Sequence, residues 1–287
     1  MNYVIILIAT IMIAVEFVFS KFYQSIEGAG LVSGLKFNAL NGLFTALIFF
    51  GISGFKIELS LFSLIMAFAF AISLMSYSII GFYILEQGGM AVYSIFLMSG
   101  GMLLPYLYGV KFLDEEYSVL RLIGVIIILA AVIFSNKTKY SFKPSFYFLC
   151  VLIFILNGFV SITSKAHQVN ETYFAVSNTN FVMYAGAAKF LLSSIALLFC
   201  KKDKKLVSFN KRTSILAILG GAVACGLSFS LQLIAADKVY ASILYPLITG
   251  GTLIFSAVAG FIFFKEKITK PQFIGISLCV IGTLFFL

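Results

Sequence analysis

Residues 91–134 read AVYSIFLMSGGMLLPYLYGVKFLDEEYSVLRLIGVIIILAAVIF, which is an apolar run, a short charged break and a second apolar run. Residues 241–285 repeat this order as ASILYPLITGGTLIFSAVAGFIFFKEKITKPQFIGISLCVIGTLF. The matched positions include Gly100 with Gly250, Gly101 with Gly251, Glu115 with Glu266 and Gly124 with Gly275. A long internal repeat means that one structural unit occurs more than once. The chain is therefore expected to contain two copies of one unit.

The composition places this unit in a membrane. Hydrophobic residues make up 61% of the chain and charged residues 11%, against about 45–50% and about 25% in soluble domains. A hydrocarbon core about 30 Å thick requires about 20 apolar residues per spanning helix. The apolar runs are long and do not alternate with polar residues, so they indicate helices rather than barrel strands. We expect an all-α, polytopic membrane protein.

Apolar runs and the breaks between them predict ten transmembrane helices. They are expected at 3–22, 31–52, 60–82, 89–111, 118–135, 146–166, 175–200, 213–235, 240–264 and 270–287. The repeat extends over all of them, because Ser20-Lys21-x-x-Gln24 matches Ser164-Lys165-x-x-Gln168 and Gly42 matches Gly186. The chain therefore divides into a first five-helix repeat, 1–138, and a second, 139–287. Five spans carry the chain to the opposite face, so the two repeats are inverted, as in many secondary transporters.

Basic residues indicate which face is cytoplasmic. The net charge is +9, and most lysines lie in short loops, so the expected partner is membrane lipid and not nucleic acid. Fourteen of the 20 Lys and Arg residues lie in the loops that follow odd-numbered helices: Lys21, Lys36, Lys137, Lys139, Lys143, Lys201, Lys202, Lys204, Lys205, Lys211, Arg212, Lys265, Lys267 and Lys270. The opposite loops carry five: Lys56, Lys111, Arg121, Lys165 and Lys238. Positive loops stay inside, so the Lys201–Arg212 loop is predicted in the cytoplasm and both termini outside a plasma membrane, taken as the bacterial inner membrane.

The two charged breaks resemble a known family. They read Phe112-Leu113-Asp114-Glu115 leading to Leu122-Ile123-Gly124, and Phe263-Phe264-Lys265-Glu266 leading to Phe273-Ile274-Gly275. Both are similar to the FLGE turn of the drug/metabolite transporter superfamily, in particular of its ten-helix EamA-like members. Asp114 and Lys265 stand where that family has glycine. The resemblance covers essentially the whole chain and implies a transporter, without implying a particular substrate.

A second resemblance is to the small multidrug resistance proteins, whose subunit is shorter. Tyr93-x-x-Phe96-x-x-x-Gly100 is similar to their Tyr-x-x-Trp-x-x-x-Gly segment, which lines the drug site in that family. The resemblance therefore implies that Tyr93 and Phe96 line a binding site. The same family has a proton-coupled glutamate on helix 1. Here Glu16 lies on the first helix, three residues from that position when the alignment is anchored on Lys21.

Two ionisable residues fall deep inside predicted helices, Glu16 well inside the first and Lys189 near the middle of the seventh. Charged groups are costly inside a bilayer and usually mark a substrate or ion pathway. A carboxyl group among apolar neighbours is stabilised in its protonated form, so Glu16 could bind a proton and a cationic substrate in turn. Lys189 could neutralise Glu16 or hold an anionic group of the substrate. The alternatives are a structural ion pair for Glu16 and a snorkelling side chain for Lys189.

Three sets of polar residues share helix faces by their spacing. They are Asn38, Asn41 and Thr45; Asn180 and Tyr184; and Tyr245, Thr249 and Thr252. Such residues can bind substrate, or they can join helices through hydrogen bonds that contribute about 0.6 kcal/mol on average. Only convergence on one cavity would favour binding. The binding candidates taken from these sets are Asn41, Asn180, Tyr184, Tyr245 and Thr249.

Aromatic residues are abundant, with 33 Phe and 14 Tyr but no Trp. Rings can enclose an organic cation through their electron-rich faces, and the candidates for such a cage are Tyr77, Tyr83, Tyr93, Phe96, Tyr106 and Tyr245. Packing within the bundle is the alternative. The glycine pairs at 100–101 and 250–251 are expected to let the fourth and ninth helices approach their neighbours closely.

No metal site or cofactor is expected. The single histidine, His167, falls at the end of the sixth predicted helix, where we expect it to be solvated. The four cysteines lack CxxC spacing, which argues against a zinc site and a disulfide framework. The sequence shows no nucleophile with a base or metal ligands, so an enzyme is not expected.

These observations predict a secondary transporter that moves a small organic metabolite or drug by alternating access, coupled to protons or another ion. Glu16 and the tyrosines favour an organic cation such as a quaternary ammonium compound. Glu16 together with Lys189 would suit an amino acid or another zwitterion. A passive channel and an intramembrane enzyme are the competing classes. We expect a monomer or homodimer in which the fourth and ninth helices line the path and the fifth and tenth form a scaffold at the periphery or between the halves.

Overall fold

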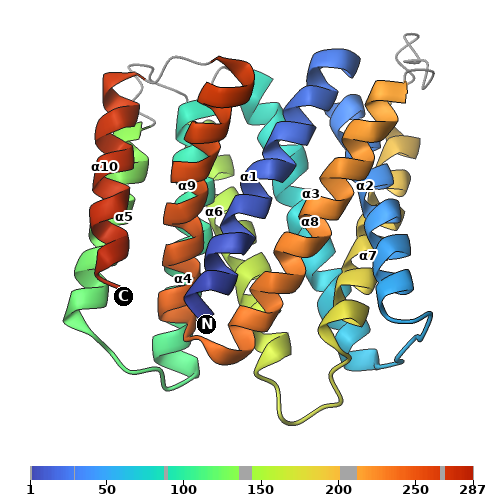
Figure 1. Cartoon of the computed structure of the whole chain (residues 1–287), viewed down its shortest axis with the longest axis horizontal. Coiled ribbons are helices and arrows are strands. Elements are labelled where there is room, and N and C mark those ends of the chain that lie inside the picture. Colours follow the sequence, from blue (N-terminus) through green and yellow to red (C-terminus); the bar gives the residue numbers. More distant parts are fainter. Residues whose placement is uncertain are drawn as a thin grey trace.

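The computed structural model describes residues 2–28, 30–86, 90–135, 144–200, 212–265 and 269–286. These residues form ten helices and no strand (Figure 1). The helices are α1 (Asn2–Glu27), α2 (Leu31–Ile52), α3 (Leu61–Glu86), α4 (Met90–Phe112), α5 (Val119–Ser135), α6 (Pro144–Gln168), α7 (Asn178–Phe199), α8 (Arg212–Lys238), α9 (Ala241–Phe264) and α10 (Lys270–Leu284). The all-helical prediction is confirmed. The predicted join at 138/139 and most of the lysine-rich loop before α8 lie outside the described residues.

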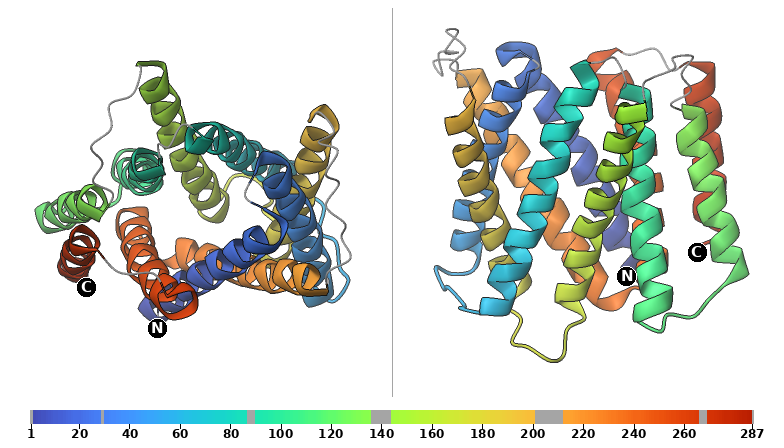
Figure 2. Two further views of the ribbon diagram at one scale, coloured as in Figure 1. Left: turned by 90° about the horizontal axis from the view of Figure 1, so that it is seen from above. Right: turned by 180° about the vertical axis from the view of Figure 1, so that it is seen from behind.

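The helices fall into two classes by length. Eight of them, all except α5 and α10, are long and apolar enough to cross a membrane. α5 has 17 residues and α10 has 15, which correspond to about 22–26 Å at 1.5 Å per residue. These two shorter helices pack against each other at one side of the molecule, as Figures 1 and 2 show. The chain is a multi-pass membrane protein, with α5 and α10 at its periphery.

Helix packing follows a regular scheme. α2 packs on α7, α4 on α9 and α5 on α10. α1 packs on α8 and α9, and α6 packs in the same way on α3 and α4. If each helix is replaced by its counterpart five places along the chain, the α2–α7, α4–α9 and α5–α10 contacts are unchanged. The contacts of α1 with α8 and α9 are exchanged for those of α6 with α3 and α4.

Close helix contacts depend on glycine. A Cβ atom added to Gly42 of α2 would lie 2.7 Å from Gly186 O of α7, and one added to Gly186 would lie 2.8 Å from Gly42 O. Likewise, a Cβ on Gly100 of α4 would overlap the backbone of Phe154, and one on Gly251 of α9 would lie 2.9 Å from the Thr10 side chain. These contacts confirm that the glycine pairs of α4 and α9 allow close approach.

The even-to-odd connections, α2–α3, α4–α5, α6–α7 and α8–α9, all lie at one end of the bundle, the bottom in Figure 1. We call this the lower end. His167, at the lower end of α6, is only 1% exposed. Its Nε2 lies 2.9 Å from Ser63 Oγ, and its ring stacks on Phe181 with centroids 3.8 Å apart. The expectation of a solvated histidine is wrong, because α6 continues to Gln168 and α3 and α7 cover the ring.

Both charged breaks contain a left-handed residue where the related family has glycine. Asp114 has φ +50° and Lys265 has φ +54°. Lys265 is the C-cap of α9, and its N–H donates to Gly260 O. A left-handed residue at this place is the usual way to end a helix, and glycine adopts it without a steric penalty from Cβ. Asp114 and Lys265 therefore adopt the backbone conformation that favours glycine, at some cost in stability.

Replacing Lys265 with glycine is expected to raise the free energy of unfolding by about 1 kcal/mol. The Lys265 side chain is exposed, so its removal costs little packing. The measurement is the thermal midpoint of the purified protein in detergent. Lys265→Ala is the control, because it removes the charge but keeps Cβ and should give no gain. An equal gain in both variants would assign the effect to charge rather than to the backbone.

Candidate functional site

A cavity of about 390 Å³ lies inside the helix bundle. Its walls come from α1, α2, α3 and α4 and from α6, α7, α8 and α9. Among the described residues, none from α5 or α10 lines it. The volume falls in the range of about 300–1,000 Å³ that is typical of small-molecule sites. α4 and α9 thus contribute to the cavity wall, and α5 and α10 pack on each other at the periphery (Figure 2); that this cavity is a transport path stays a prediction.

Six of the residues that the sequence indicates as substrate-binding candidates line this cavity. They are Glu16, Asn41, Tyr77, Lys189, Tyr245 and Thr249. The other members of two polar sets, Asn38 and Thr45 on α2 and Thr252 on α9, line it as well. Polar groups spaced along separate helices thus converge on one space, which is the condition under which the sequence favoured substrate binding over helix joining.

Lys189 and Asn41 form the most defined polar contact in the cavity. Lys189 Nζ donates a hydrogen bond to Asn41 Oδ1 at 3.0 Å. Asn41 is fully buried, and its Nδ2 has no hydrogen-bond partner. An unpaired buried donor costs about 1–3 kcal/mol. Lys189 and Asn41 together present N–H groups without an acceptor, which is an arrangement suited to a carboxylate or another anionic group.

Glu16 occupies another part of the same cavity. It lies beside the Cys225 thiol of α8 and interacts electrostatically with Lys189. Within the described residues the Lys189 ammonium donates to Asn41 and has no hydrogen bond with Glu16. The side-chain group that contacts the Glu16 carboxyl is thus the neutral Cys225 thiol and not a cation, so the carboxyl group can still take up a cation or a proton. The two opposite charges stay separate instead of closing into a structural ion pair.

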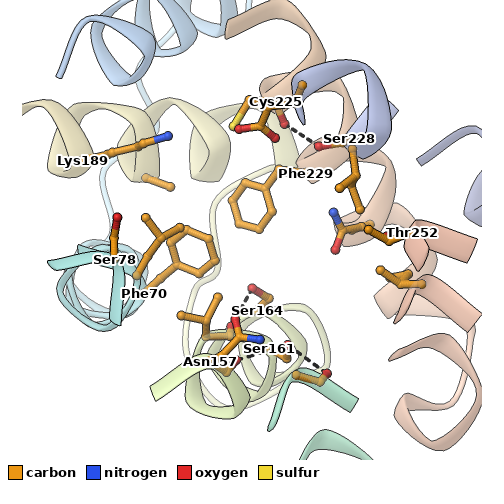
Figure 3. Close-up of a pocket in the computed structure, with 18 of the residues that line it drawn as sticks. Phe70, Ser78, Asn157, Ser161, Ser164, Lys189, Cys225, Ser228, Phe229 and Thr252 are labelled. Atoms are coloured by element: carbon orange, nitrogen blue, oxygen red, sulfur yellow. Dashed lines mark hydrogen bonds between the residues drawn. The ribbon is translucent and has the colours of Figure 1, made fainter. Parts of the chain in front are cut away.

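α6 supplies a polar wall that the sequence reasoning missed. Figure 3 shows Asn157, Ser161 and Ser164 on this wall, across the cavity from Cys225 and Ser228. Asn157 Nδ2 donates to Leu97 O of α4 at 2.7 Å. Tyr245 OH of α9 donates to Ser161 O at 2.6 Å. The signal available in the sequence was an asparagine in the middle of an apolar helix, because intramembrane polar residues usually face a cavity.

Apolar groups complete the lining. The rings of Phe70 and Phe229 stack with centroids 4.6 Å apart, and Figure 3 shows both at the cavity. Phe17, Ile13 and Ile248 also line it. The site therefore combines a few fixed polar groups with apolar walls, which is the usual composition of a small-molecule pocket.

Tyr93 and Phe96 lie outside this lining. Both pack against a buried cluster of Phe146, Cys150 and Ile153 between α4 and α6. A Cβ on Gly81 would lie 2.8 Å from the Tyr93 ring, so this ring fills the space that a glycine of α3 leaves. The two residues share a helix with lining residues, but their side chains point between helices.

Asn180 and Tyr184 also lie away from the cavity, at the lower end. Asn180 Oδ1 accepts a hydrogen bond from the Glu58 N–H at 3.2 Å, and Tyr184 OH donates to Glu58 O. Glu58 Oε2 in turn accepts from the Ser177 N–H at 2.6 Å. These two residues hold the α2–α3 connection on the start of α7. Helical spacing correctly placed the two residues on one face of α7, but the cavity is lined by another face of the same turns, which carries Val182 and Ala185.

The proposed aromatic cage is only partly assembled. Tyr77 and Tyr245 line the cavity, whereas Tyr106 is buried in a separate cluster with Met102 and Val125. The side chain of Tyr83 lies outside the described residues. Among the described residues, two of the six candidate rings line the cavity together with phenylalanines from other positions, and the packing alternative holds for Tyr93, Phe96 and Tyr106.

Comparisons with known proteins agree with this architecture. The model of the EamA-like transporter family matches residues 144–287. A solved crystal structure is similar to the chain with a TM-score of 0.75, and the alignment covers 97% of this chain and 95% of the other at 14% identity. At this identity the likeness shows the fold alone. No curated protein matches the chain.

Proposed function

Because the chain belongs to the EamA-like transporter family, we propose that it is a secondary transporter of a small organic solute that works by alternating access. Membership of the family implies a membrane transporter of small molecules. The cavity and its charges support the binding of a small organic solute and alternating access. The substrate would bind between helices α1–α4 and α6–α9, near the middle of the membrane.

The two moving parts would be the halves 1–138 and 139–287. The packing scheme supports this division, because each contact between the halves either stays the same or becomes another observed contact when the halves are exchanged. Gly42 and Gly186, which match in the sequence repeat, face each other across the α2–α7 contact. A pair of equivalent glycines in direct contact is what a local two-fold relation between the halves would produce. Rocking of the halves about such a contact would expose the cavity to each side in turn.

The substrate class that the cavity favours is a zwitterion such as an amino acid. One observation carries this proposal: Glu16 and Lys189 line the same cavity without a hydrogen bond to each other, and Asn41 Nδ2 beside Lys189 has no partner. A carboxylate on the substrate would accept hydrogen bonds from Lys189 and Asn41. An amine on the same substrate would face Glu16. The apolar walls would take the remaining carbon atoms.

An organic cation is the second candidate, and Glu16 with the aromatic lining favours it. Tyr77, Tyr245, Phe70 and Phe229 all reach the cavity, and ring faces attract cations. Lys189 opposes this candidate, because a second positive charge in the same cavity would repel the ligand.

A ligand panel separates the two candidates. We expect leucine to raise the thermal midpoint of the purified protein more than isopentylamine or 4-methylpentanoate, which keep its isobutyl side chain but carry one charge each. Amino acids with larger and smaller side chains, each tested beside the corresponding amine and carboxylate, extend the comparison to substrates of other sizes. Counterflow of the best binder in proteoliposomes, with and without a pH gradient, then tests transport and coupling. Tighter binding of tetraethylammonium or of the amines would favour the cation. Flux without saturation would indicate a channel.

We also propose that the lower end faces the outside. The support is the excess of lysines in the loops of the other end, of which the described part includes Arg212 and Lys265. Cys200, the partly exposed C-cap of α7, lies at the end opposite to the lower end. An impermeant maleimide should therefore label Cys200 in inside-out vesicles and not in intact cells. The reverse pattern would invert the proposed topology.

A further inference from the structure

The α8–α9 turn at the lower end is held by two buried ionisable side chains. On one side Lys165 of α6, 4% exposed, donates from Nζ to Ala236 O at 2.6 Å and to Val239 O at 2.8 Å. These carbonyls belong to the last turn of α8 and the residue after it. The end of a helix carries partial negative charge on its unpaired carbonyls. A lysine ammonium is therefore matched to this end in both charge and hydrogen bonding.

On the other side a carboxylate holds the start of α9. Glu115, 6% exposed, accepts from the Ala241 N–H at Oε1 (2.5 Å) and from the Ser242 N–H at Oε2 (2.9 Å). The start of a helix presents unpaired N–H groups and partial positive charge. The carboxylate rests on Gly109 of α4, where an added Cβ would overlap it. Glu115 and Lys165 also attract each other electrostatically.

The clamp formed by Glu115 and Lys165 is connected to the cavity by one helical turn on each side. Tyr245, four residues after Ala241, donates to the carbonyl of Ser161, four residues before Lys165, at 2.6 Å. Tyr245 and Ser161 both line the cavity. A movement of the α8–α9 turn would therefore displace a wall of the cavity. Because Glu115 belongs to the first half and α9 to the second, such a movement would also separate the halves at this end.

We infer that Glu115 and Lys165 are positioning residues of the transport cycle: they lock the α8–α9 turn so that the cavity is closed at the lower end, and their release opens it there. This inference rests on the proposed alternating access. A purely structural clamp would hold through the whole cycle, and its loss would lower stability without changing which side reaches the cavity.

Cys225 is a natural reporter of access because it lines the cavity. The test uses the full chain with Cys150, Cys200 and Cys279 replaced by alanine, in right-side-out and inside-out vesicles. The probe is the impermeant 2-(trimethylammonium)ethyl methanethiosulfonate. We expect Glu115→Gln to increase the rate of Cys225 modification from the lower-end side about ten-fold and to decrease it from the opposite side, since a shift of this size needs only one lost charged hydrogen bond. Glu116→Gln, an exposed neighbour, is the matched control and should leave both rates unchanged.

Two further variants keep the inference testable if Glu115→Gln does not fold. Ala241→Pro removes one N–H that Glu115 accepts from, at a helix position that tolerates proline, and the extended Tyr240 before it (φ −53°, ψ 139°) suits a following proline. It should raise lower-end modification as well. Lys165→Arg keeps donors to the α8 carbonyls and should behave as wild type, whereas Lys165→Met should not. Unchanged side preference in Glu115→Gln or Ala241→Pro would overturn the inference. Counterflow by the wild-type protein in the same vesicles reports separately on the proposed function.

Discussion

Replacing Lys189 with methionine is expected to weaken binding of a carboxylate-bearing ligand by about 10- to 150-fold. A hydrogen bond to a charged group contributes about 1.5–3 kcal/mol, and each 1.4 kcal/mol corresponds to about ten-fold in Kd. Lys189 is the cation next to the unpaired Asn41 amide, so its loss removes both the charge and one donor. Methionine keeps most of the side-chain volume, which limits the effect on packing. The measurement is Kd by isothermal titration of the best zwitterion from the panel.

Two variants make this result interpretable. Lys189→Arg keeps the positive charge and should lose much less affinity than Lys189→Met. Glu16→Gln should leave binding of the matched carboxylate analogue unchanged, weaken binding of the zwitterion, and abolish flux driven by a proton gradient. If Lys189→Met instead binds the zwitterion as well as wild type and gains affinity for tetraethylammonium, the lysine opposes a cationic substrate and the zwitterion proposal is wrong. Full proton-coupled transport by Glu16→Gln would remove Glu16 from the coupling step.

Replacing Gly42 with leucine is expected to destabilise the fold by about 3 kcal/mol or more, at the upper end of the range for overpacked sites. A Cβ at this position would lie 2.7 Å from Gly186 O and 2.9 Å from Phe190 N. Both atoms belong to the backbone of α7, so no side-chain rotation relieves the overlap, and α2 and α7 have to separate. The expected result is a low yield of monodisperse protein on size-exclusion chromatography and a lower thermal midpoint.

Gly51 provides the matched control for this prediction. It lies on the same helix, is exposed, and has nothing within 4 Å of the position of an added Cβ. Gly51→Leu should therefore retain wild-type yield and stability. Gly42→Ala should fall between the two, because the methyl group alone produces the overlap. Equal behaviour of the two leucine variants would show that the α2–α7 contact has room that the backbone distances do not indicate.

Much of the site was predictable because of the membrane itself. Glu16, Asn41 and Lys189 stand out in an otherwise apolar sequence, since a bilayer makes such residues costly unless they face a cavity or each other. The same logic would have identified Asn157, which lies in the middle of α6 among apolar residues. Tyr93 and Phe96 were placed by resemblance to a related family, and in this chain their rings fill space between α4 and α6.

Other features depended on how each helix is rotated against its neighbours, which residue spacing does not report. Spacing shows that Asn180 and Tyr184 share one face of α7, but that face is turned toward Glu58, whereas Val182 and Ala185 of the same turns line the cavity. The charged breaks show the same limit. The sequence marks Glu115 as part of a repeated turn, but its partners at Ala241 and Ser242 are 126 and 127 residues away. Only the assembled helices bring them together.

The sequence by itself determined that this is an all-helical, multi-pass membrane protein with an internal sequence repeat and charged residues inside its helices. Those features follow from the composition, the length of the apolar runs and the internal repeat, which can be recognised by comparing segments of one sequence. The tertiary structure decided which polar groups share a cavity, that Lys189 pairs with Asn41 instead of Glu16, and that Lys165 and Glu115 clamp one helix turn. These depend on how helices are rotated and shifted against each other, and contacts such as that of Gly42 with Gly186 set that arrangement.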